Sequence, residues 1–329
     1  MRKELELWQF IADRLRLGEN VTLLVVAESS GSSPGRAGYK MAVAANGKLC
    51  GSIGGGVMEV NLVNESVQAM SVPPAVAGGA FLVEQVHQKD SPNASGMICS
   101  GRQSVISAQL TSRELEEVEL ILANLREGHE PWIWISELGF SAAPEESEPQ
   151  NCPLPKFERK GDIFQYSDKL GPKHHLYIVG GGHCSLALSE MMSRLDFKVV
   201  VIDDRPDLNT LAKNDLADRI SIVSDYDLIR HQIPEDWDVY VVVMTLGYAS
   251  DKAVIKQLCD RDFKYFGVLG SKAKMATLIR ELKDEGVPAE QLERIRTPIG
   301  IAINSRTPEE IAVSIAAEII SVKNAKKMI

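Results

Sequence analysis

The chain has 329 residues, of which 44% are hydrophobic and 25% are charged, a composition typical of globular proteins. This length predicts two domains. The formal net charge of −9 argues against a nucleic acid partner, because an acidic surface repels a phosphate backbone and no long run of Lys and Arg opposes the total.

The five cysteines are far apart and form no C-x-x-C pair. This indicates a reducing compartment and excludes a zinc knuckle. The first twenty residues are rich in charge and predict an amphipathic helix rather than a secretory signal. The longest apolar runs, such as Val21–Ala27, are far shorter than the roughly 20 residues that a membrane helix needs. We therefore expect a soluble, cytoplasmic protein with no membrane partner.

After the first helix, runs rich in β-branched residues predict strands, and Leu and Val at helical spacing predict helices. Asn46-Gly47 is a hairpin signal between two of the strands. The predicted strands cover residues 21–29, 41–45, 48–51, 80–86 and 132–135, and the helices start near Val57 and span 111–126. Between Gly139 and Gly161, four prolines are mixed with glutamates, which predicts the interdomain connection or a longer excursion. We expect an N-terminal domain over residues 1–165 and a C-terminal domain over 170–329.

The second half alternates strands and helices, which predicts a parallel sheet with helices on both faces. The last helix begins at Thr307, where Glu310 can close a capping box. The predicted strands are 175–179, 198–202, 220–223, 239–244 and 264–269, and the predicted helices are 184–195, 250–259 and 271–285. The fold class is therefore α/β: a Rossmann-like C-terminal domain and a smaller N-terminal α/β domain with a mixed sheet.

A glycine turn, Gly180-Gly181-Gly182-His183, connects the first of these strands to a helix. In a Rossmann fingerprint such glycines let the backbone approach a pyrophosphate at the helix N-terminus. Asp203 and Asp204 end the next strand about 20 residues later, where they could accept hydrogen bonds from ribose hydroxyls. The alternative is a turn that only packs the helix on the sheet. His183 could equally contact a ligand phosphate or metal, or bond to neighbouring backbone.

A second candidate anion site follows the last strand. Gly270-Ser271-Lys272 opens a helix at the edge where open α/β sheets bind ligands. The alternative is an ordinary Ser N-cap followed by a solvated Lys.

Two glycine-rich loops mark the N-terminal domain. Glycine clusters usually mark a special backbone conformation or a close approach of a ligand. Amides at the start of the following helix, together with an arginine fork, would suit a phosphate or a pterin edge. The alternative is tight turns between strands. The candidate residues are Gly31, Ser32, Ser33 and Arg36 in the first loop, Gly54, Gly55 and Gly56 in the second, and Glu59 one turn into the helix.

Cys99 lies in a stretch of small residues and close to Arg102. A neighbouring cation favours the thiolate, which is a soft ligand for a metal or sulfur. Cys99 is therefore a candidate molybdenum or sulfur ligand, with a buried, inert thiol as the alternative.

Together these segments resemble the XdhC/CoxI family, the accessory factors of xanthine dehydrogenase and related molybdenum hydroxylases. In the first half the resemblance is carried by SSGSSPGRAGYKM, GSIGGGVMEV and GMICSGR. In the second half it is carried by YIVGGGHCSLAL, VVVIDDRP, GVLGSKAK and TPIGIAINSRTPEEIAVSIAAEI. It implies a homodimeric chaperone without turnover that binds molybdenum cofactor (molybdopterin) during its sulfuration and passes it to the apo-hydroxylase, with a cysteine desulfurase as a second partner. The implied contacts are the two glycine loops, Cys99, the Gly180–His183 turn and Gly270–Lys272.

Two other functions remain open at this stage. An NAD-dependent oxidoreductase would use the glycine turn and acidic pair to bind NAD(P), but no Tyr-x-x-x-Lys motif or His–Asp pair stands out for hydride transfer. A nucleotide-sensing regulatory protein would bind its ligand in the Rossmann-like half.

Overall fold

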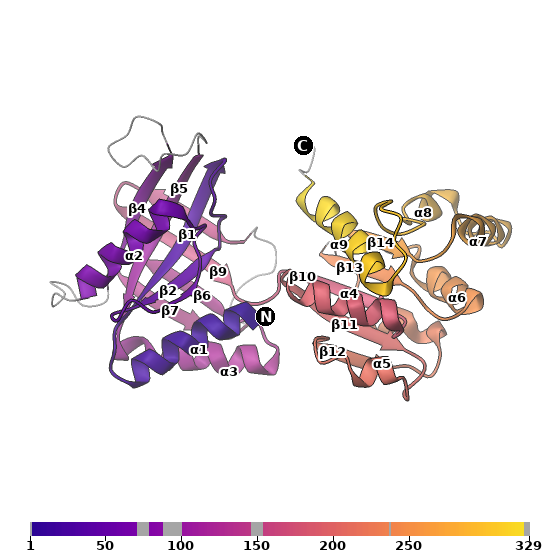
Figure 1. Ribbon diagram of the computed structural model, residues 1–329, viewed down its shortest axis with the longest axis horizontal. Coiled ribbons are helices and arrows are strands. Elements are labelled where there is room, and N and C mark those ends of the chain that lie inside the picture. The colour runs from indigo at the N-terminus through magenta and orange to yellow at the C-terminus, as the bar shows by residue number, and fades with distance from the viewer. Residues whose placement is uncertain (1, 71–78, 88–100, 146–153, 237, 326–329) are drawn as a thin grey trace. The chain divides into compact units, whose positions relative to one another are not determined.

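The computed structural model describes residues 2–70, 79–87, 101–145, 154–236 and 238–325. The chain divides into two compact units, unit 1 (Met1–Gly171) and unit 2 (Pro172–Ile329), and each is described by itself (Figure 1). None of the helices in these ranges is long and apolar enough to cross a membrane.

Unit 1 contains two sheets, ordered β3-β2-β1-β5-β4 and β7-β6-β9-β8. Every pairing between its described strands is antiparallel, so the mixed sheet expected here is in fact two antiparallel ones. Sequential neighbours such as β2 and β3 are joined by short turns, which can connect only antiparallel strands. The strands are β1 Val21–Gly31, β2 Lys40–Ala44, β3 Leu49–Gly51, β4 Ala80–His87, β5 Gly101–Leu110, β6 Trp132–Ser136, β7 Gly139–Ala143, β8 Lys156–Lys160 and β9 Ile163–Lys169.

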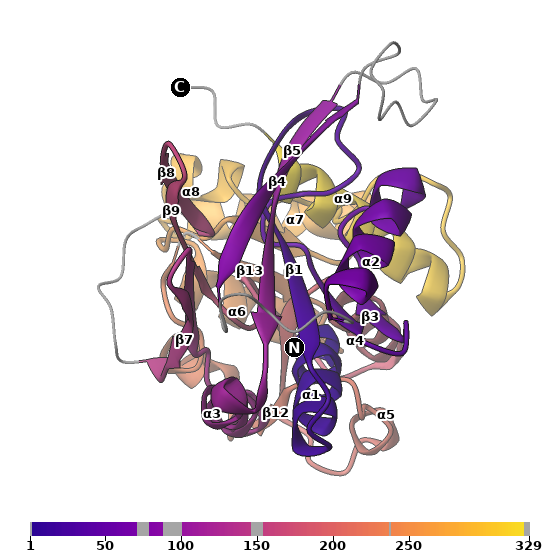
Figure 2. The same cartoon turned by 90° about the vertical axis from the view of Figure 1, so that its left-hand side faces the viewer.

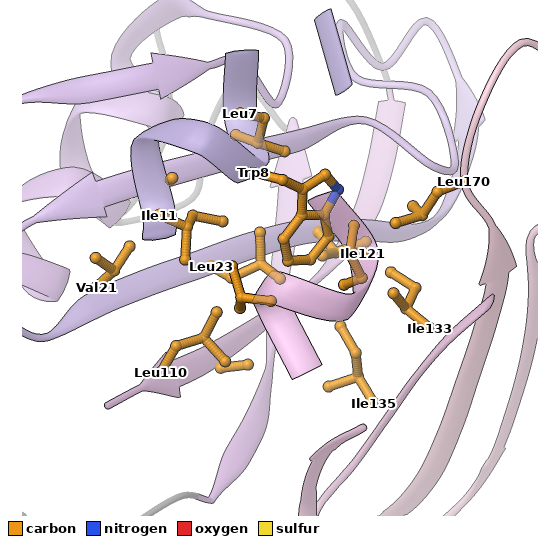
Figure 3. Close-up of a cluster of buried hydrophobic side chains, with 14 of the residues drawn as sticks. Leu7, Trp8, Ile11, Val21, Leu23, Leu110, Ile121, Ile133, Ile135 and Leu170 are labelled. Atoms are coloured by element: carbon orange, nitrogen blue, oxygen red, sulfur yellow. The ribbon is translucent and has the colours of Figure 1, made fainter. Parts of the chain in front are cut away.

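Helices cover both faces of the first sheet. Val21, Leu23 and Val25 of β1 join the larger core, whereas Leu24 and Val26 point to the opposite face. This alternation follows from the period of two in a strand. Figure 2 shows α2 alongside β1. Figure 3 shows the larger core around Trp8, with side chains from α1, β1, α3 and β6 pointing toward one another. The helices are α1 Arg2–Arg16, α2 Gly56–Met70, η1 Ser112–Glu114 and α3 Leu115–Glu127.

For segment 139–161 the sequence leaves open an interdomain connection or a longer excursion, and the described strands favour the excursion. The segment supplies β7 and β8 to the second sheet, and the division between the units falls between Gly171 and Pro172. Both strands lie at the edges of this sheet, and β8 is largely exposed. An edge strand with one exposed face needs few apolar residues, so its sequence carries little periodic signal.

A buried ion cluster ties the two sheets of unit 1 together. Lys40 of β2 donates to Asp168 of β9 at 2.8 Å, to Glu4 of α1 at 3.0 Å and to the carbonyl oxygen of Gly38 at 3.2 Å. The Tyr166 hydroxyl donates to the same carboxylate oxygen of Asp168 at 3.2 Å. The side chains of Lys40 and Asp168 are 4% and 0% exposed. Because water hardly reaches either charge, each is stabilised mainly by its charged partner.

Unit 2 is a five-stranded parallel sheet in the order β12-β11-β10-β13-β14. This confirms the Rossmann-like α/β prediction. Its strands are β10 His174–Val179, β11 Phe197–Asp203, β12 Arg219–Ile222, β13 Val239–Val243 and β14 Tyr265–Val268. Its helices are α4 His183–Ser193, α5 Asn209–Ala212, η3 Tyr226–His231, α6 Tyr248–Leu258, α7 Lys272–Asp284, α8 Ala289–Glu293 and α9 Pro308–Asn324.

Apolar cores lie on both faces of this parallel sheet. One core packs the sheet against α6, α7 and α8, and the other packs it against α4 and α9. The expected capping box is present at the start of α9. The Thr307 hydroxyl accepts from the backbone amide of Glu310, and the Glu310 carboxylate accepts from the backbone amide of Thr307. The strand order reverses direction between β10 and β13, and open α/β sheets bind ligands outside the carboxyl ends of strands at such a point.

Candidate functional site

The two glycine loops of unit 1 are in direct backbone contact. A Cβ atom placed on Gly54 would lie 2.5 Å from the amide nitrogen of Gly35, and one on Gly35 would lie 2.3 Å from the carbonyl oxygen of Ile53. A Cβ on Gly101 would lie 2.5 Å from the amide nitrogen of Ser33. Segments about 20 and 70 residues apart in sequence therefore meet at one place. Glycine is required at Gly35, Gly54 and Gly101 because the backbones lie so close together that no side-chain atom fits between them.

Glu59 occupies the amides that the sequence assigns to an anion. One of its carboxylate oxygens accepts from the Ser52 hydroxyl at 2.7 Å and from the amides of Ile53 and Gly55, both at 2.9 Å. The amide of Gly54 donates to the Ser52 hydroxyl at 3.1 Å. The anion cradle expected at Gly54 and Gly55 stays a prediction, but in this structure the Ser52 hydroxyl and the Glu59 carboxylate already accept from these two amides.

Replacing Glu59 by alanine should destabilise unit 1 by about 1–3 kcal/mol, because hydrogen bonds to a carboxylate are stronger than those between neutral groups. Glu65→Ala on the exposed side of the same helix should change stability by less than about 0.5 kcal/mol. Chemical denaturation of both variants measures the difference. Equal stabilities would mean that Glu59 does not hold the loop.

Arg36 is the exposed cation of the first loop. Its guanidinium has no hydrogen bond or ion pair to any residue that the structure describes, whereas Arg102 pairs with Glu84 at 3.3 Å. Gly31 and Ser32 are also exposed, and Gly56 is exposed at the start of α2. Arg36 is thus available to a ligand from solution, while Ser33 is buried and donates to Gln103 at 2.7 Å.

A chain of buried amide side chains links these loops to α2. Gln103 accepts from Ser33 and from the amide of Gly35 at 3.2 Å, and its own NH2 group donates to Gln85 at 2.7 Å. Gln85 in turn donates to the carbonyl oxygen of Met58, in the first turns of α2, at 3.1 Å. We did not predict Gln85 and Gln103 from the sequence, although Gln85 is a polar residue inside a predicted strand.

Cys99 and the rest of segment 88–100 lie outside the described residues. The structure therefore gives no geometry for the expected metal or sulfur ligand. Among the residues that it does describe, no group of three or more His, Cys, Asp and Glu side chains could hold a metal ion.

In unit 2, the glycine turn packs tightly against the loop after β13. Gly180 has φ +109°, and a Cβ atom there would lie 2.3 Å from the carbonyl oxygen of Met244. Its amide donates to the carbonyl oxygen of Ile202 at 2.8 Å. Gly180 is therefore needed by the fold itself, and its amide is already engaged.

Asp203 braces the turn from inside. It is fully buried, and its carboxylate accepts from the amide of Gly181 at 2.5 Å and from both Nε and Nη2 of Arg205 at 2.9 and 2.8 Å. Burial raises the pKa of this carboxyl, but the hydrogen bonds from Arg205 and Gly181 outweigh burial and lower it. The ribose contact of Asp203 stays a prediction, and the groups that its carboxylate already accepts from weigh against it. Asp204 is exposed and accepts from the Tyr226 hydroxyl at 3.2 Å.

Asp203→Asn should cost about 2 kcal/mol at neutral pH, because it removes the charge that accepts from Arg205. A carboxyl whose pKa is lowered in the folded state stabilises the protein above its ordinary pKa of 3.8 and loses that contribution as pH falls. The stability difference between wild type and variant should therefore shrink below that pH. Denaturant titrations at several pH values measure it, and a constant difference would contradict this role.

The end of the turn, at Gly182 and His183, is not packed against other residues that the structure describes. A Cβ atom on Gly182 would meet nothing within 4 Å, and His183 is exposed as the first residue of α4. Gly182 caps α4 without a side-chain hydrogen bond, and the amides of His183 and Cys184 find no acceptor in the described ranges. An anion fits here, where helix N-termini favour negative charge. Burial and the nearby Glu309 raise the pKa of the Cys184 thiol, which therefore stays protonated at neutral pH.

The Gly270-Ser271-Lys272 segment forms an ordinary helix start. The Ser271 hydroxyl accepts from the amide of Lys274 at 3.2 Å, and Lys272 is exposed. The engaged cation is Lys274, which donates at 2.7 Å to buried Asp251, and Asp251 also accepts from the Thr245 hydroxyl at 2.6 Å. This pair joins α7 to α6, and the Thr245 hydroxyl adds the loop after β13 to it. We did not predict the pair from the sequence.

The parallel sheet, with its glycine turn where the strand order reverses, defines unit 2 as a Rossmann-type domain. A family model described as the XdhC Rossmann domain matches residues 176–319, and the model of the XdhC and CoxI family matches residues 14–73. The chain belongs to the XdhC and CoxI family, which confirms the resemblance seen in its motifs.

Individual relatives extend over most of the chain. The chain is 24% identical over 328 residues to a probable xanthine dehydrogenase subunit of Bacillus subtilis (strain 168), covering 93% of this chain and 94% of that protein. It is 24% identical over 301 residues to the uncharacterized protein YqeB of Escherichia coli (strain K12), covering 91% of this chain but only 43% of YqeB. A crystal structure of a xanthine dehydrogenase from Bacillus halodurans has the same fold, with a TM-score of 0.72, 22% identity, and coverage of 99% and 97% of the two chains.

Proposed function

We propose that this protein has an accessory role in a xanthine dehydrogenase system. In this role it binds molybdenum cofactor, assists its sulfuration and passes it to the apo-hydroxylase without turnover of its own. Membership of the XdhC and CoxI family and the similarity to a probable xanthine dehydrogenase subunit support the accessory role. The binding and transfer of the cofactor require residues that can hold its phosphate and pterin.

The observation that carries the proposal is the unpaired Arg36 beside the contact of the two glycine loops. Family motifs that are far apart in sequence build this place, and they leave one guanidinium directed to no other described residue. Its planar fork matches a phosphate or the polar edge of a pterin. The amides of Gly54 and Gly55 take no part, because they already donate to Ser52 and Glu59.

In unit 2, Gly182 and His183 are the residues that would hold a phosphate group. The space around Gly182 is open, and the imidazole of His183 is exposed. The backbone amides of His183 and Cys184 have no acceptor among the described residues. Gly180 and Gly181 do not fit this role, because Ile202 and Asp203 already accept from their amides. The engagement of Asp203 also weighs against the NAD-dependent alternative, in which this acid would bind the ribose.

The test is cofactor retention by the full-length chain. The protein is purified from a host that makes molybdenum cofactor, and bound molybdenum and pterin are measured by mass spectrometry and by fluorescence after oxidation. We expect Arg36→Gln to lower retention at least about tenfold, which corresponds to the loss of one charge-assisted hydrogen bond. Gly182→Val should lower retention as well, because its side chain would occupy the open space in front of the helix amides. Arg113→Gln is the matched control, because Arg113 is also exposed and its side chain has no partner in the described part of the chain.

Delivery is tested separately. Wild-type protein loaded with cofactor should activate a xanthine dehydrogenase-type apo-hydroxylase, and a cysteine desulfurase should increase that activation. Light scattering measures the proposed homodimer. Micromolar binding of NAD(H) by calorimetry, without retention of pterin, would overturn the chaperone function and favour the oxidoreductase or nucleotide sensor.

A further inference from the structure

Unit 1 contains a cavity of about 280 Å³ that lies between α2 and the first sheet. Its roof is the second half of α2, from Leu62 to Ala69, and its floor is formed by β1 and β5. The glycine loops contact the other end of α2, where the helix begins. The cavity therefore has no part in the site proposed above.

The floor of this cavity is polar, whereas the part of the same sheet face next to it is apolar. Thr22 of β1 lies opposite Gln109 of β5, and Ser107 is the next residue of β5 on that face. Further along these strands, Leu24 and Val105 occupy the same face and pack under α2. Strand positions under a helix are normally apolar, because a buried polar group without a partner costs free energy.

Gln109 is the residue that points to a ligand. Its side-chain nitrogen is buried, and no described residue accepts a hydrogen bond from it. Buried amide groups are almost always satisfied in folded proteins, so an orphaned donor that lines a cavity indicates a bound partner. Thr22 and Ser107 add two hydroxyls to the same floor, and a hydroxyl can donate or accept.

The walls and the charge of the cavity define the class of ligand. Leu62, Ala69, Ala80 and the 58% exposed Phe81 supply apolar surface. Glu65 is the one ionisable side chain of the lining, and a carboxylate at the rim repels anions. The volume lies just below the range of roughly 300–1,000 Å³ typical of drug-sized ligands, which suits one or two rings rather than a nucleotide.

We propose that this cavity binds a small, uncharged ring compound with a carboxamide or lactam edge. The carbonyl oxygen of that edge accepts from Gln109, its N–H group donates to a hydroxyl of the floor, and the ring packs against Leu62 and Phe81.

Benzamide and benzoate are the probes, because they have the same shape and differ in charge at neutral pH. Binding to the full-length protein is measured by calorimetry and by protein-observed NMR, with 2-pyridone as the lactam probe. We expect saturable binding of benzamide and 2-pyridone, with benzoate at least about tenfold weaker. Absence of saturable binding for both neutral probes, or equal binding of benzoate, would overturn the proposal.

Variants locate the bound probe. Gln109→Leu should weaken benzamide binding at least about tenfold without lowering the melting temperature, since it removes an unsatisfied polar group. Gln68→Leu, on the exposed side of α2 and outside the lining, is the matched control and should bind like wild type. If Gln109→Leu unfolds the protein, Ala69→Phe fills the cavity from the exposed side of α2 and should abolish binding. Unchanged binding in a folded Gln109→Leu or Ala69→Phe variant would contradict the assignment.

Discussion

Gly54→Ala is expected to lower the free energy of unfolding of unit 1 by about 3 kcal/mol or more, whereas Gly55→Ala should cost about 1 kcal/mol. Both glycines have positive φ, +125° and +78°, so both substitutions strain the backbone. Only at Gly54 does the added Cβ also meet the backbone of Gly35, at 2.5 Å. Gly55→Ala therefore measures the cost of backbone strain alone. The additional loss in Gly54→Ala measures the clash between the two loops.

Denaturant titration followed by tryptophan fluorescence measures this pair of variants. Three of the four tryptophans, Trp8, Trp132 and Trp134, are in unit 1, so the signal reports mainly its unfolding. Similar losses of stability for Gly54→Ala and Gly55→Ala would show that the loops separate easily in solution.

Lys40→Met is expected to destabilise unit 1 by about 3–5 kcal/mol, because it leaves Asp168 as a buried charge without its cation. Lys48→Met, at an exposed position after the β2–β3 turn, should change stability by less than about 0.5 kcal/mol. Calorimetry or denaturant titration measures both. Because replacing a whole buried ion pair by apolar residues is often tolerated, the double variant Lys40→Met/Asp168→Leu should recover much of the loss. A further loss in the double variant would contradict this account.

The same cluster gives a pH dependence with a definite sign. Burial alone lowers the pKa of Lys40, but the carboxylates of Asp168 and Glu4 outweigh burial and raise it well above 10.5. Burial and the charge of Asp168 also raise the pKa of Tyr166 well above 10.0. Groups with raised pKa values contribute their full stability below the ordinary pKa and lose it as pH rises.

Unit 1 should therefore lose stability as pH increases beyond about 10, and Lys40→Met should flatten that dependence. Thermal unfolding monitored between neutral and alkaline pH measures the slope. An equally steep alkaline loss in the variant would assign the dependence to other groups.

The elements of both units are predictable because each buries an apolar face with a clear period. The continuous apolar run Val21–Ala27, rich in β-branched residues, and the strand–helix repeats of unit 2 need no tertiary information to be recognised. Strands β5, β7, β8 and β9 are not among the strands that we predict. Of these, β7 and β8 are edge strands that bury little and lie next to prolines. The division between the units, after Gly171, lies within a few residues of the domain bounds that we expect from the sequence.

The candidate site shows a different limit. The sequence correctly marks glycines where backbone approaches backbone, but it does not say what approaches. Glu59 and Asp203 were expected to face a ligand, and both instead accept hydrogen bonds from the turns that they accompany. A carboxylate two residues before an arginine, or one turn after a glycine loop, can fold back locally, and this choice depends on side-chain geometry that spacing does not encode.

The amide chain from Ser33 through Gln103 and Gln85 to Met58 contains no group that gains or loses a proton in ordinary buffers. Alkaline conditions can thus remove the stability that Lys40 contributes without titrating any group of this amide chain. In unit 1, the contact between the two sheets at Lys40 and Asp168 therefore depends on alkaline pH, whereas the amide chain beneath the glycine loops does not.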